Sequence, residues 1–200
     1  MDIRSFLSKH FNDWIVRDWV KKGRLFPPPS AYKRQVIKGY ANKFSIQVFI
    51  ETGTYRGDTV AAMRQSFDKV ISIELDKILY KKACQRFSSC KNTMIVQGDS
   101  ALSLRQVLVN IDKPCLFWLD GHFSGGITAC GVTECPVFAE LQAIIDHSVR
   151  DHVILIDDAR MFVGKNGWPT LDELRKFVSQ GFPKHHLEIE DDIIRISYPV

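Results

Sequence analysis

Short hydrophobic runs alternate with helix-like stretches over most of the chain. The runs are rich in β-branched residues and almost continuously apolar, which is typical of strands that are buried on both faces. They lie near residues 46–51, 69–74, 93–97, 115–120 and 152–157, and helical patterns lie around residues 58–67, 77–88, 100–110, 134–148 and 170–179. This alternation predicts an α/β fold, in which a mostly parallel sheet carries helices on both faces.

The two ends of the chain depart from this alternation. Near the C-terminus, H-L-E-I-E and I-I-R-I-S-Y flank Asp191-Asp192, which predicts two antiparallel strands joined by a tight turn. At the N-terminus, apolar residues recur at roughly helical spacing as far as Pro27-Pro28-Pro29, where the helix must stop because proline cannot continue it. We therefore predict a basic N-terminal helical arm over residues 1–44 and an α/β domain over residues 45–200.

Composition favours a soluble cytoplasmic protein with one folded domain. The 200 residues are 45% hydrophobic and 25% charged, which are ordinary globular values. No apolar run approaches the ~18 residues that cross a bilayer, and the first residues lack the apolar stretch of a secretory signal. The five cysteines are an odd and scattered set, so we expect reduced thiols rather than a disulfide framework.

The net charge of +4 is unevenly distributed. Residues 1–44 contain ten basic and three acidic residues, whereas the remainder contains 17 basic and 20 acidic residues. Such an arm can cover a substrate, pair two subunits or contact an acidic partner. Its aromatic stripe of Phe11, Trp14 and Trp19 favours packing on the body or, as a homodimer, on a second copy, and nucleic-acid binding is the minor alternative.

The first predicted strand leads into a glycine-containing turn, E-T-G-T-Y-R-G-D-T. Glycines at a strand-to-helix turn let the backbone bend tightly and approach a ligand. The spacing G-x-x-x-G differs from the G-x-G-x-x-G of dinucleotide-binding loops, which disfavours a nicotinamide oxidoreductase. A purely structural turn is the alternative. The candidate ligand-binding residues of this segment are Glu51, Gly53, Thr54, Tyr55, Gly57 and Thr59.

Polar residues also follow the second and third predicted strands. Glu74 ends the second strand, where a carboxylate can accept hydrogen bonds from a ribose diol, and Asp76 is the second candidate for this role. Asp99 and Ser100 follow the third strand, where each can bind a ligand, cap the next helix, or do both. Because ligands bind at the carboxyl ends of strands in open α/β sheets, we expect these residues to form one site.

Three aspartates follow the fourth and fifth predicted strands. Asp120, Asp157 and Asp158 converge if these strands are neighbours, and they then repel one another unless a cation lies among them. Oxygen ligands suit Mg²⁺, whereas helix caps or surface acids are the plain alternative. His122 is the candidate general base because its ordinary pKa of about 6.5 suits proton transfer, although a surface role is the alternative. The glycine-rich stretch 121–133 is typical of a mobile lid.

Together these motifs resemble class I S-adenosylmethionine-dependent methyltransferases. The first loop is similar to their E-x-G-x-x-x-G cofactor loop, which often has glycine where this chain has Tyr55. The set of Asp120 with Asp157-Asp158 resembles the metal triad of catechol-type O-methyltransferases and, more closely, that of the macrocin and mycinamicin sugar O-methyltransferases. The resemblance covers about residues 46–160. The lysine base of the catechol-type enzymes is replaced by Phe123, which leaves the identity of the base open.

This resemblance implies a Rossmann-like three-layer sandwich with a seven-stranded sheet and a C-terminal antiparallel hairpin. It also implies an S-adenosylmethionine site in which Asp99 lies beside the adenine and Asp120 lies near the methyl donor. The leading hypothesis is Mg²⁺-assisted O-methylation of a small hydroxylated molecule, a sugar or a secondary metabolite, with Asp120 and His122 as catalytic residues. The alternatives are a metal-independent methyltransferase acting on nitrogen or nucleic acid, and a non-catalytic module that binds S-adenosylmethionine or a nucleotide.

Overall fold

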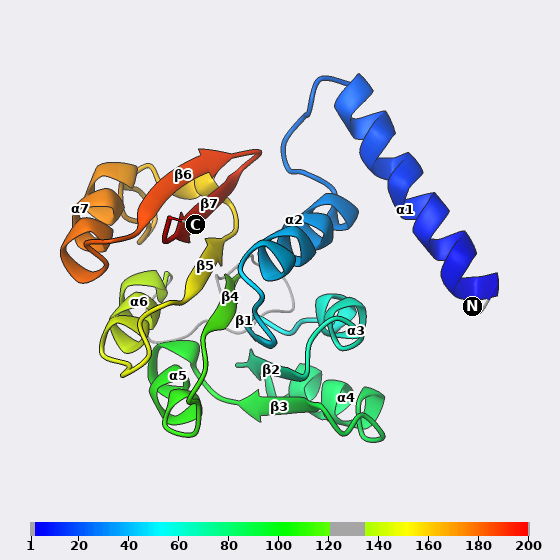
Figure 1. Cartoon of the computed structure of the whole chain (residues 1–200), viewed down its shortest axis with the longest axis horizontal. Helices are drawn as coiled ribbons and strands as arrows, with labels where there is room; N and C mark the ends of the chain where they lie inside the picture. Colours follow the sequence, from blue (N-terminus) through cyan, green and yellow to red (C-terminus); the bar gives the residue numbers. More distant parts are fainter. Residues whose placement is uncertain (1–2, 121–134, 200) are drawn as a thin grey trace.

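One mixed sheet forms the centre of the computed structural model, which describes residues 3–120 and 135–199 (Figure 1). Its strands are β1 (Val48–Thr52), β2 (Lys69–Glu74), β3 (Thr93–Gln97), β4 (Cys115–Leu119), β5 (Val153–Ile156), β6 (His186–Glu190) and β7 (Ile193–Ser197). Their order in the sheet is β3-β2-β1-β4-β5-β7-β6. The first five strands pair in parallel, and β7 runs antiparallel to both β5 and β6. The predicted Rossmann-like architecture with its terminal hairpin is therefore confirmed.

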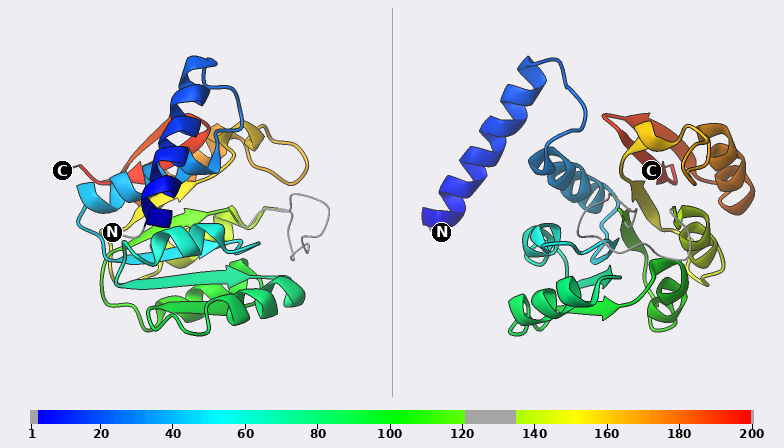
Figure 2. Two further views of the ribbon diagram at one scale, coloured as in Figure 1. Left: turned by 90° about the vertical axis from the view of Figure 1, so that its right-hand side faces the viewer. Right: turned by 180° about the vertical axis from the view of Figure 1, so that it is seen from behind.

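Helices cover both faces of this sheet (Figures 1 and 2). One layer consists of α2 (Ser30–Lys43), α3 (Asp58–Met63) and α4 (Lys77–Arg86), and the other of α5 (Ser100–Leu108), α6 (Val137–Ile145) and α7 (Leu171–Gly181). Successive strand residues point to opposite faces, so Phe49 and Leu116 pack in the first layer's core while Ile50 and Phe117 pack in the second. This two-sided burial is the reason that the central strands are continuously apolar.

Strand β3 differs from the expectation of burial on both faces. It lies at one edge of the sheet and has only partly buried or exposed residues, among them Met94 with 44% of its surface exposed. The expectation is correct for β1, β2, β4 and β5 but wrong for residues 93–97. An edge strand has a neighbour on one side only, so its apolar residues do not report full burial.

The N-terminal segment divides into two helices with different surroundings. Helix α1 (Ile3–Lys21) lies apart from the sandwich, whereas α2 packs in its outer layer through Ile37 and Ala41 (Figure 1). At the end of α1, Trp19 is buried against Tyr32 with ring centroids 4.6 Å apart. The other two aromatics of the predicted stripe stay outside: Phe11 and Trp14 stack on each other and are 61% and 60% exposed.

Helix α2 is tied to the hairpin formed by β6 and β7. The Tyr40 hydroxyl donates to Glu188 at 2.6 Å, and the Tyr32 hydroxyl donates to Asp191 at the hairpin turn. Asp191 and Asp192 both have positive φ angles, 51° and 65°, as in the two-residue turns that join twisted antiparallel strands. The hairpin thus holds α2 against the sheet.

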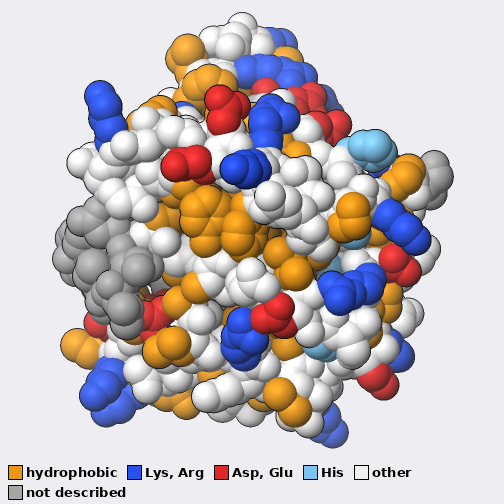
Figure 3. Space-filling view, turned by 90° about the vertical axis from the view of Figure 1, so that its left-hand side faces the viewer, with side chains coloured by type: hydrophobic (Ala, Val, Ile, Leu, Met, Phe, Trp, Pro, Cys, Tyr) orange, Lys and Arg blue, Asp and Glu red, His pale blue; other side chains and the backbone are white. Residues whose placement is uncertain are grey.

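The surface carries both signs of charge. On the face shown in Figure 3, acidic and basic side chains are interspersed around hydrophobic ones rather than gathered in a field of one sign. Within residues 3–120 and 135–199, no helix is long and apolar enough to span a bilayer. The four cysteines of this described part are all free thiols.

Candidate functional site

The parallel strands end at one rim of the sheet, where the sequence places its candidate residues. The register pairs Thr52 of β1 with both Ile73 of β2 and Leu119 of β4, and Leu119 in turn with Ile156 of β5. The residues that follow these positions therefore lie side by side. Glu74 comes next on β2, and Asp120 and Asp157 directly follow the ends of β4 and β5.

The loop after β1 depends on three residues with left-handed backbone angles. Gly53 and Gly57 have φ angles of 84° and 75°, and Tyr55 between them has 48°. A side chain at Gly57 is also excluded by space, because a Cβ atom there would lie 2.7 Å from the Phe87 ring. Tyr55 thus adopts a backbone conformation that glycine favours. Thr59 follows in the first turn of α3 and is half-buried.

The carboxylate of Glu74 is held in place by the backbone. Its Oε2 accepts the Tyr55 N–H at 2.7 Å, and its Oε1 accepts the Asp76 N–H at 2.9 Å. Burial raises the pKa of Glu74, and these two N–H donors oppose the rise. Each carboxylate oxygen can accept a further hydrogen bond, so Glu74 suits a ribose diol. Asp76, the second candidate for this role, instead caps α4 by accepting from two backbone N–H groups.

Glu51 lies beneath the loop rather than in it. Its side chain is buried, and it accepts a hydrogen bond from Ser72 at 2.7 Å. The Ser72 hydroxyl also lies 2.5 Å from that of Thr54. Burial raises the pKa of Glu51 to about 8, so this carboxyl is mostly protonated at neutral pH. Glu51 and Thr54 thus form a buried polar network that supports the loop.

A buried acid that the sequence reasoning missed lies near Asp99 and Ser100. Asp99 caps α5 by accepting the Ala101 N–H at 3.0 Å, and Ser100 is buried beside it. Glu140 of α6 is fully buried, and within the described residues its two carboxylate oxygens have no hydrogen-bond partner. Burial raises the pKa of Glu140 to about 7, against the opposing effect of the Ser100 and Thr52 hydroxyls. The signal was a single acid in the apolar helix V-F-A-E-L-Q-A-I-I.

The structure brings the three predicted aspartates together and adds a lysine from α2. The Lys33 ammonium forms a very short ion pair with Asp157 Oδ2 and lies 3.9 Å from Asp158 Oδ1. Burial and the neighbouring Asp157 raise the pKa of Asp120 well above its usual range, and Lys33 opposes this shift. Burial alone would lower the pKa of Lys33, but the three carboxylates raise it, so the amine stays charged. The cation that these aspartates require is thus supplied by the protein.

In the sequence alone, Lys33 is one of the basic residues of the predicted arm. It lies four residues before Ile37 and eight before Ala41, so it shares the buried stripe of α2. Its side chain is 19% exposed, which is low for lysine. A lysine in line with an apolar helix face was the available signal, but nothing local in the sequence connected it to Asp157.

The arrangement of the aspartates does not fit Mg²⁺. Asp157 uses one oxygen for Lys33 and the other for the Asp158 N–H at 2.9 Å. Asp158 pairs with Arg160 at 2.9 Å, and Arg160 also binds Asp192. Among the residues that the structure describes, no three His, Cys, Asp or Glu side chains are placed to hold a metal ion. His122 and the stretch 121–133, the candidate base and lid, lie outside the described residues.

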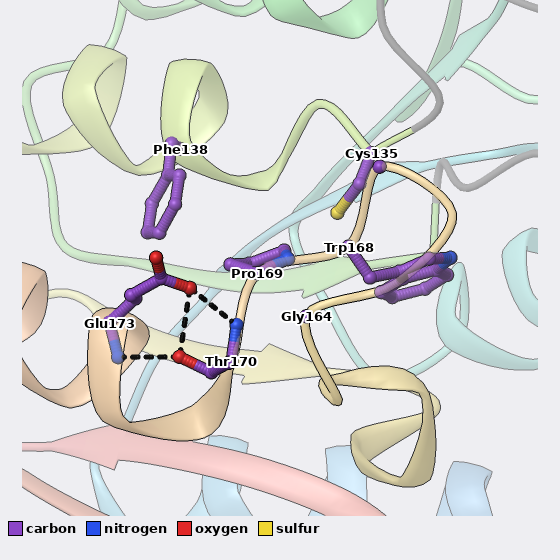
Figure 4. A pocket seen from close by; sticks show the side chains of 8 residues that line it. Cys135, Phe138, Gly164, Trp168, Pro169, Thr170 and Glu173 are labelled. Carbon is purple, nitrogen blue, oxygen red and sulfur yellow. Dashed lines mark hydrogen bonds between the residues drawn. The ribbon is translucent and has the colours of Figure 1, made fainter.

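A pocket of about 440 Å³ lies between the start of α6 and the loop before α7 (Figure 4). It is lined by Cys135, Phe138, Gly164, Gly167, Trp168, Pro169, Thr170 and Glu173. The Glu173 carboxylate turns toward Thr170 and accepts its N–H and O–H at 2.7 and 2.8 Å, which caps α7. Burial raises the pKa of Cys135 to about 12, so its thiol is neutral. Aromatic and neutral groups therefore dominate a pocket whose segments follow β4 and β5, as the aspartates do.

No protein-family model matches the sequence, and no curated protein matches it in a sequence search. Solved structures of methyltransferases share its fold. The methyltransferase PaMTH1 of Podospora anserina, bound to SAH, superposes with a TM-score of 0.60 at 13% identity, covering 100% of this chain and 98% of that one. An O-methyltransferase of Bacillus cereus in complex with SAH gives 0.61 at 12% identity, covering 93% and 90%. The O-methyltransferase TomG of Streptomyces achromogenes, in complex with SAM, gives 0.59 at 11% identity, covering 94% and 89%.

Proposed function

We propose that this protein is an S-adenosylmethionine-dependent methyltransferase that methylates a hydroxyl group of a small molecule. The observation that carries the proposal is the carboxylate of Glu74, fixed by the N–H groups of Tyr55 and Asp76 at the end of β2. It lies beside a loop with glycines in the left-handed conformation, in a fold shared with methyltransferases solved with SAM or SAH. A ribose diol is the ligand that such a carboxylate recognises.

The remaining polar groups of the rim suit an adenosyl group. An adenine offers an exocyclic amine that donates hydrogen bonds, and Asp99 and Glu140 lie near each other with carboxylate oxygens that can accept them. Within the described residues the Glu140 oxygens have no hydrogen-bond partner in good geometry, which leaves them able to accept from such a donor. The Gly53 and Gly57 turn allows the backbone to approach the ligand.

S-adenosylmethionine supplies an electrophilic methyl group on a sulfonium, which is already a good leaving group. The protein's task is therefore to align an acceptor oxygen with this methyl group and to accept its proton. The methyl–sulfur bond breaks as the methyl–oxygen bond forms, the sulfur keeps the electron pair, and a base takes the hydroxyl proton. Asp120, which directly follows β4, and His122, two residues later in the sequence, are the candidate bases.

The pocket before α7 is the candidate acceptor site. Phe138 and Trp168 line the pocket with aromatic rings, which can stack on sugar or aromatic rings, and Glu173 is the one charged residue among the eight that line it. This composition favours a small, largely uncharged, hydroxylated acceptor. The Mg²⁺ assistance expected from the sequence does not suit the observed arrangement of Asp157 and Asp158, so no step of the proposed reaction relies on it.

Calorimetric titration of the purified chain with S-adenosylhomocysteine and with NAD⁺ tests the proposal. We expect saturable binding of S-adenosylhomocysteine alone. The variant Glu74→Gln removes charge-assisted hydrogen bonds, each worth about 1.5–3 kcal/mol, and should weaken binding by about ten-fold or more. The matched control Asp172→Asn, at an exposed site on α7, should bind as the wild type does. Binding of NAD⁺ but not of S-adenosylhomocysteine would refute the assignment.

A further inference from the structure

The three aspartates at the ends of β4 and β5 create a concentration of negative charge that the fold must compensate. Asp157 is almost completely buried, and the pKa of Asp120 is strongly raised by burial and by Asp157. Ion pairs at such depth are retained only when the opposite charge is well placed, because a buried unpaired carboxylate is costly. In catechol-type methyltransferases, which this set resembles, a metal ion occupies this position.

The structure places an ammonium group there instead. Lys33 forms a very short ion pair with Asp157, lies within 4 Å of Asp158 and is close enough to Asp120 to affect its pKa. The second oxygen of Asp157 is engaged by the Asp158 backbone, and Asp158 is further paired with Arg160. A divalent ion would need these same oxygens and would meet two cationic side chains, so lysine and metal exclude each other.

The helix that carries Lys33 is firmly positioned. Tyr32, the preceding residue, donates its hydroxyl to Asp191 of the hairpin, and Ile37, one turn later, is buried in the core. The side chain of Lys33 is itself mostly buried, so it does not reach the aspartates by chance from solvent. These contacts fix the ammonium before any ligand binds, which is the condition for an electrostatic role.

We propose that Lys33 takes the place of a divalent metal among the aspartates that follow β4 and β5, and that its ammonium donates a hydrogen bond to the acceptor oxygen at this rim. This inference rests on the proposed methyltransferase function. An ammonium has three N–H bonds, of which Asp157 accepts one, so others can donate to the acceptor hydroxyl. Such a donor orients the oxygen and stabilises the negative charge that develops on it as its proton moves to the base. Metal ions are then unnecessary for methyl transfer.

Mn²⁺ binding to the full chain, measured by electron paramagnetic resonance, tests this inference and does not require the acceptor to be known. The chelator-treated wild type should show no saturable binding site up to about 1 mM Mn²⁺, since Lys33 fills it. Lys33→Ala should gain one saturable site with at least ten-fold higher affinity than any wild-type binding, because the carboxylates lose their cation. Lys33→Ala combined with Asp157→Asn should lose this site again. Lys38→Ala removes the same charge from an exposed position of α2 and should behave as the wild type.

Two further measurements separate the outcomes. Thermal melting followed by circular dichroism shows whether each variant is folded. The double variant lacks both the Lys33 ammonium and the Asp157 carboxylate, so it leaves no unpaired buried charge and keeps the test valid if Lys33→Ala is unstable. S-adenosylhomocysteine should bind to all folded variants, because the cofactor residues are unchanged. Saturable Mn²⁺ binding by the wild type, or no gain in Lys33→Ala, would overturn the role of Lys33. If the wild type does not bind S-adenosylhomocysteine, the methyltransferase proposal is instead overturned.

Discussion

At the amino end of β5, a chain of histidines makes the stability of the fold sensitive to acid. The ring of His152 is completely buried, and its Nδ1 accepts the backbone N–H of Cys115 at 3.0 Å. In the neutral ring, the proton must therefore be on Nε2, which donates to His147 Nδ1 at 3.0 Å. By the same logic, His147 Nε2 carries a proton and donates to the Ile111 carbonyl at 3.0 Å. A protonated His152 would lose its bond to Cys115.

The magnitude follows from the pKa of His152, which burial and the neighbouring His147 and His185 lower to about 4. In the unfolded chain the pKa is about 6.5. As the pH falls from about 6.5 to about 4, His152 binds a proton in the unfolded state but not in the native state. The free energy of unfolding therefore decreases. The difference of about 2.5 pKa units corresponds to about 3 kcal/mol, lost between pH 6.5 and pH 4.

The variant His152→Asn removes this titration while its side-chain oxygen can still accept the Cys115 N–H. We expect it to be less stable than the wild type at pH 7.5, because the bond to His147 is gone. That difference should shrink by about 3 kcal/mol on going to pH 4, as measured by urea unfolding at several pH values. His10→Asn, the same substitution at an exposed position of α1, serves as the control. A stability difference that stays constant from pH 7.5 to pH 4 would show that His152 titrates normally and that the reasoning is wrong.

Two other predictions concern the buried acid beneath the loop after β1 and the exposed aromatic pair of α1. Because the pKa of Glu51 in the folded protein is about 8, its carboxyl stays protonated there, and the free energy of unfolding decreases as the pH rises from about 4.5 to 8. Urea unfolding should therefore show Glu51→Gln gaining up to about 5 kcal/mol relative to the wild type over this range. The exposed pair of Phe11 and Trp14 is the surface through which we predict that a homodimer forms. Sedimentation should show a dimer that Phe11→Ser with Trp14→Ser dissociates, and a monomeric wild type would contradict this.

Much of the sheet and its functional rim was predictable because the strands carry a strong local signal. Continuous apolar runs located β1, β2, β4 and β5, and parallel pairing then required Glu74 and the three aspartates to share one edge. The sequence predicted a strand at residues 93–97 but not its position at the edge of the sheet, because hydrophobic periodicity does not show which strands pair with each other. The tight turn at Asp191-Asp192 followed from its flanking strands.

The electrostatic partners were not predictable, since they come from distant segments. Lys33 and Asp157 are separated by 124 positions in the sequence, and only the packing of α2 on the sheet brings them together. Glu140 reaches the rim from the opposite helical layer. Asp76 and Asp99 could be read as ligand residues or as helix caps, and both caps are present, so the sequence alone could not separate the two uses.

The attachment of α2 to the C-terminal hairpin has a consequence for how the protein is made. Residues 30–43 leave the ribosome before the hairpin does, and the carboxylates that accept from the Tyr32 and Tyr40 hydroxyls lie on its turn and on β6, which are synthesised later. Lys33 therefore reaches its final place only after nearly all of the described chain has emerged. A nascent chain that lacks the hairpin can pair β1, β2 and β3, yet the ion pair between Lys33 and Asp157 forms only when the hairpin positions α2.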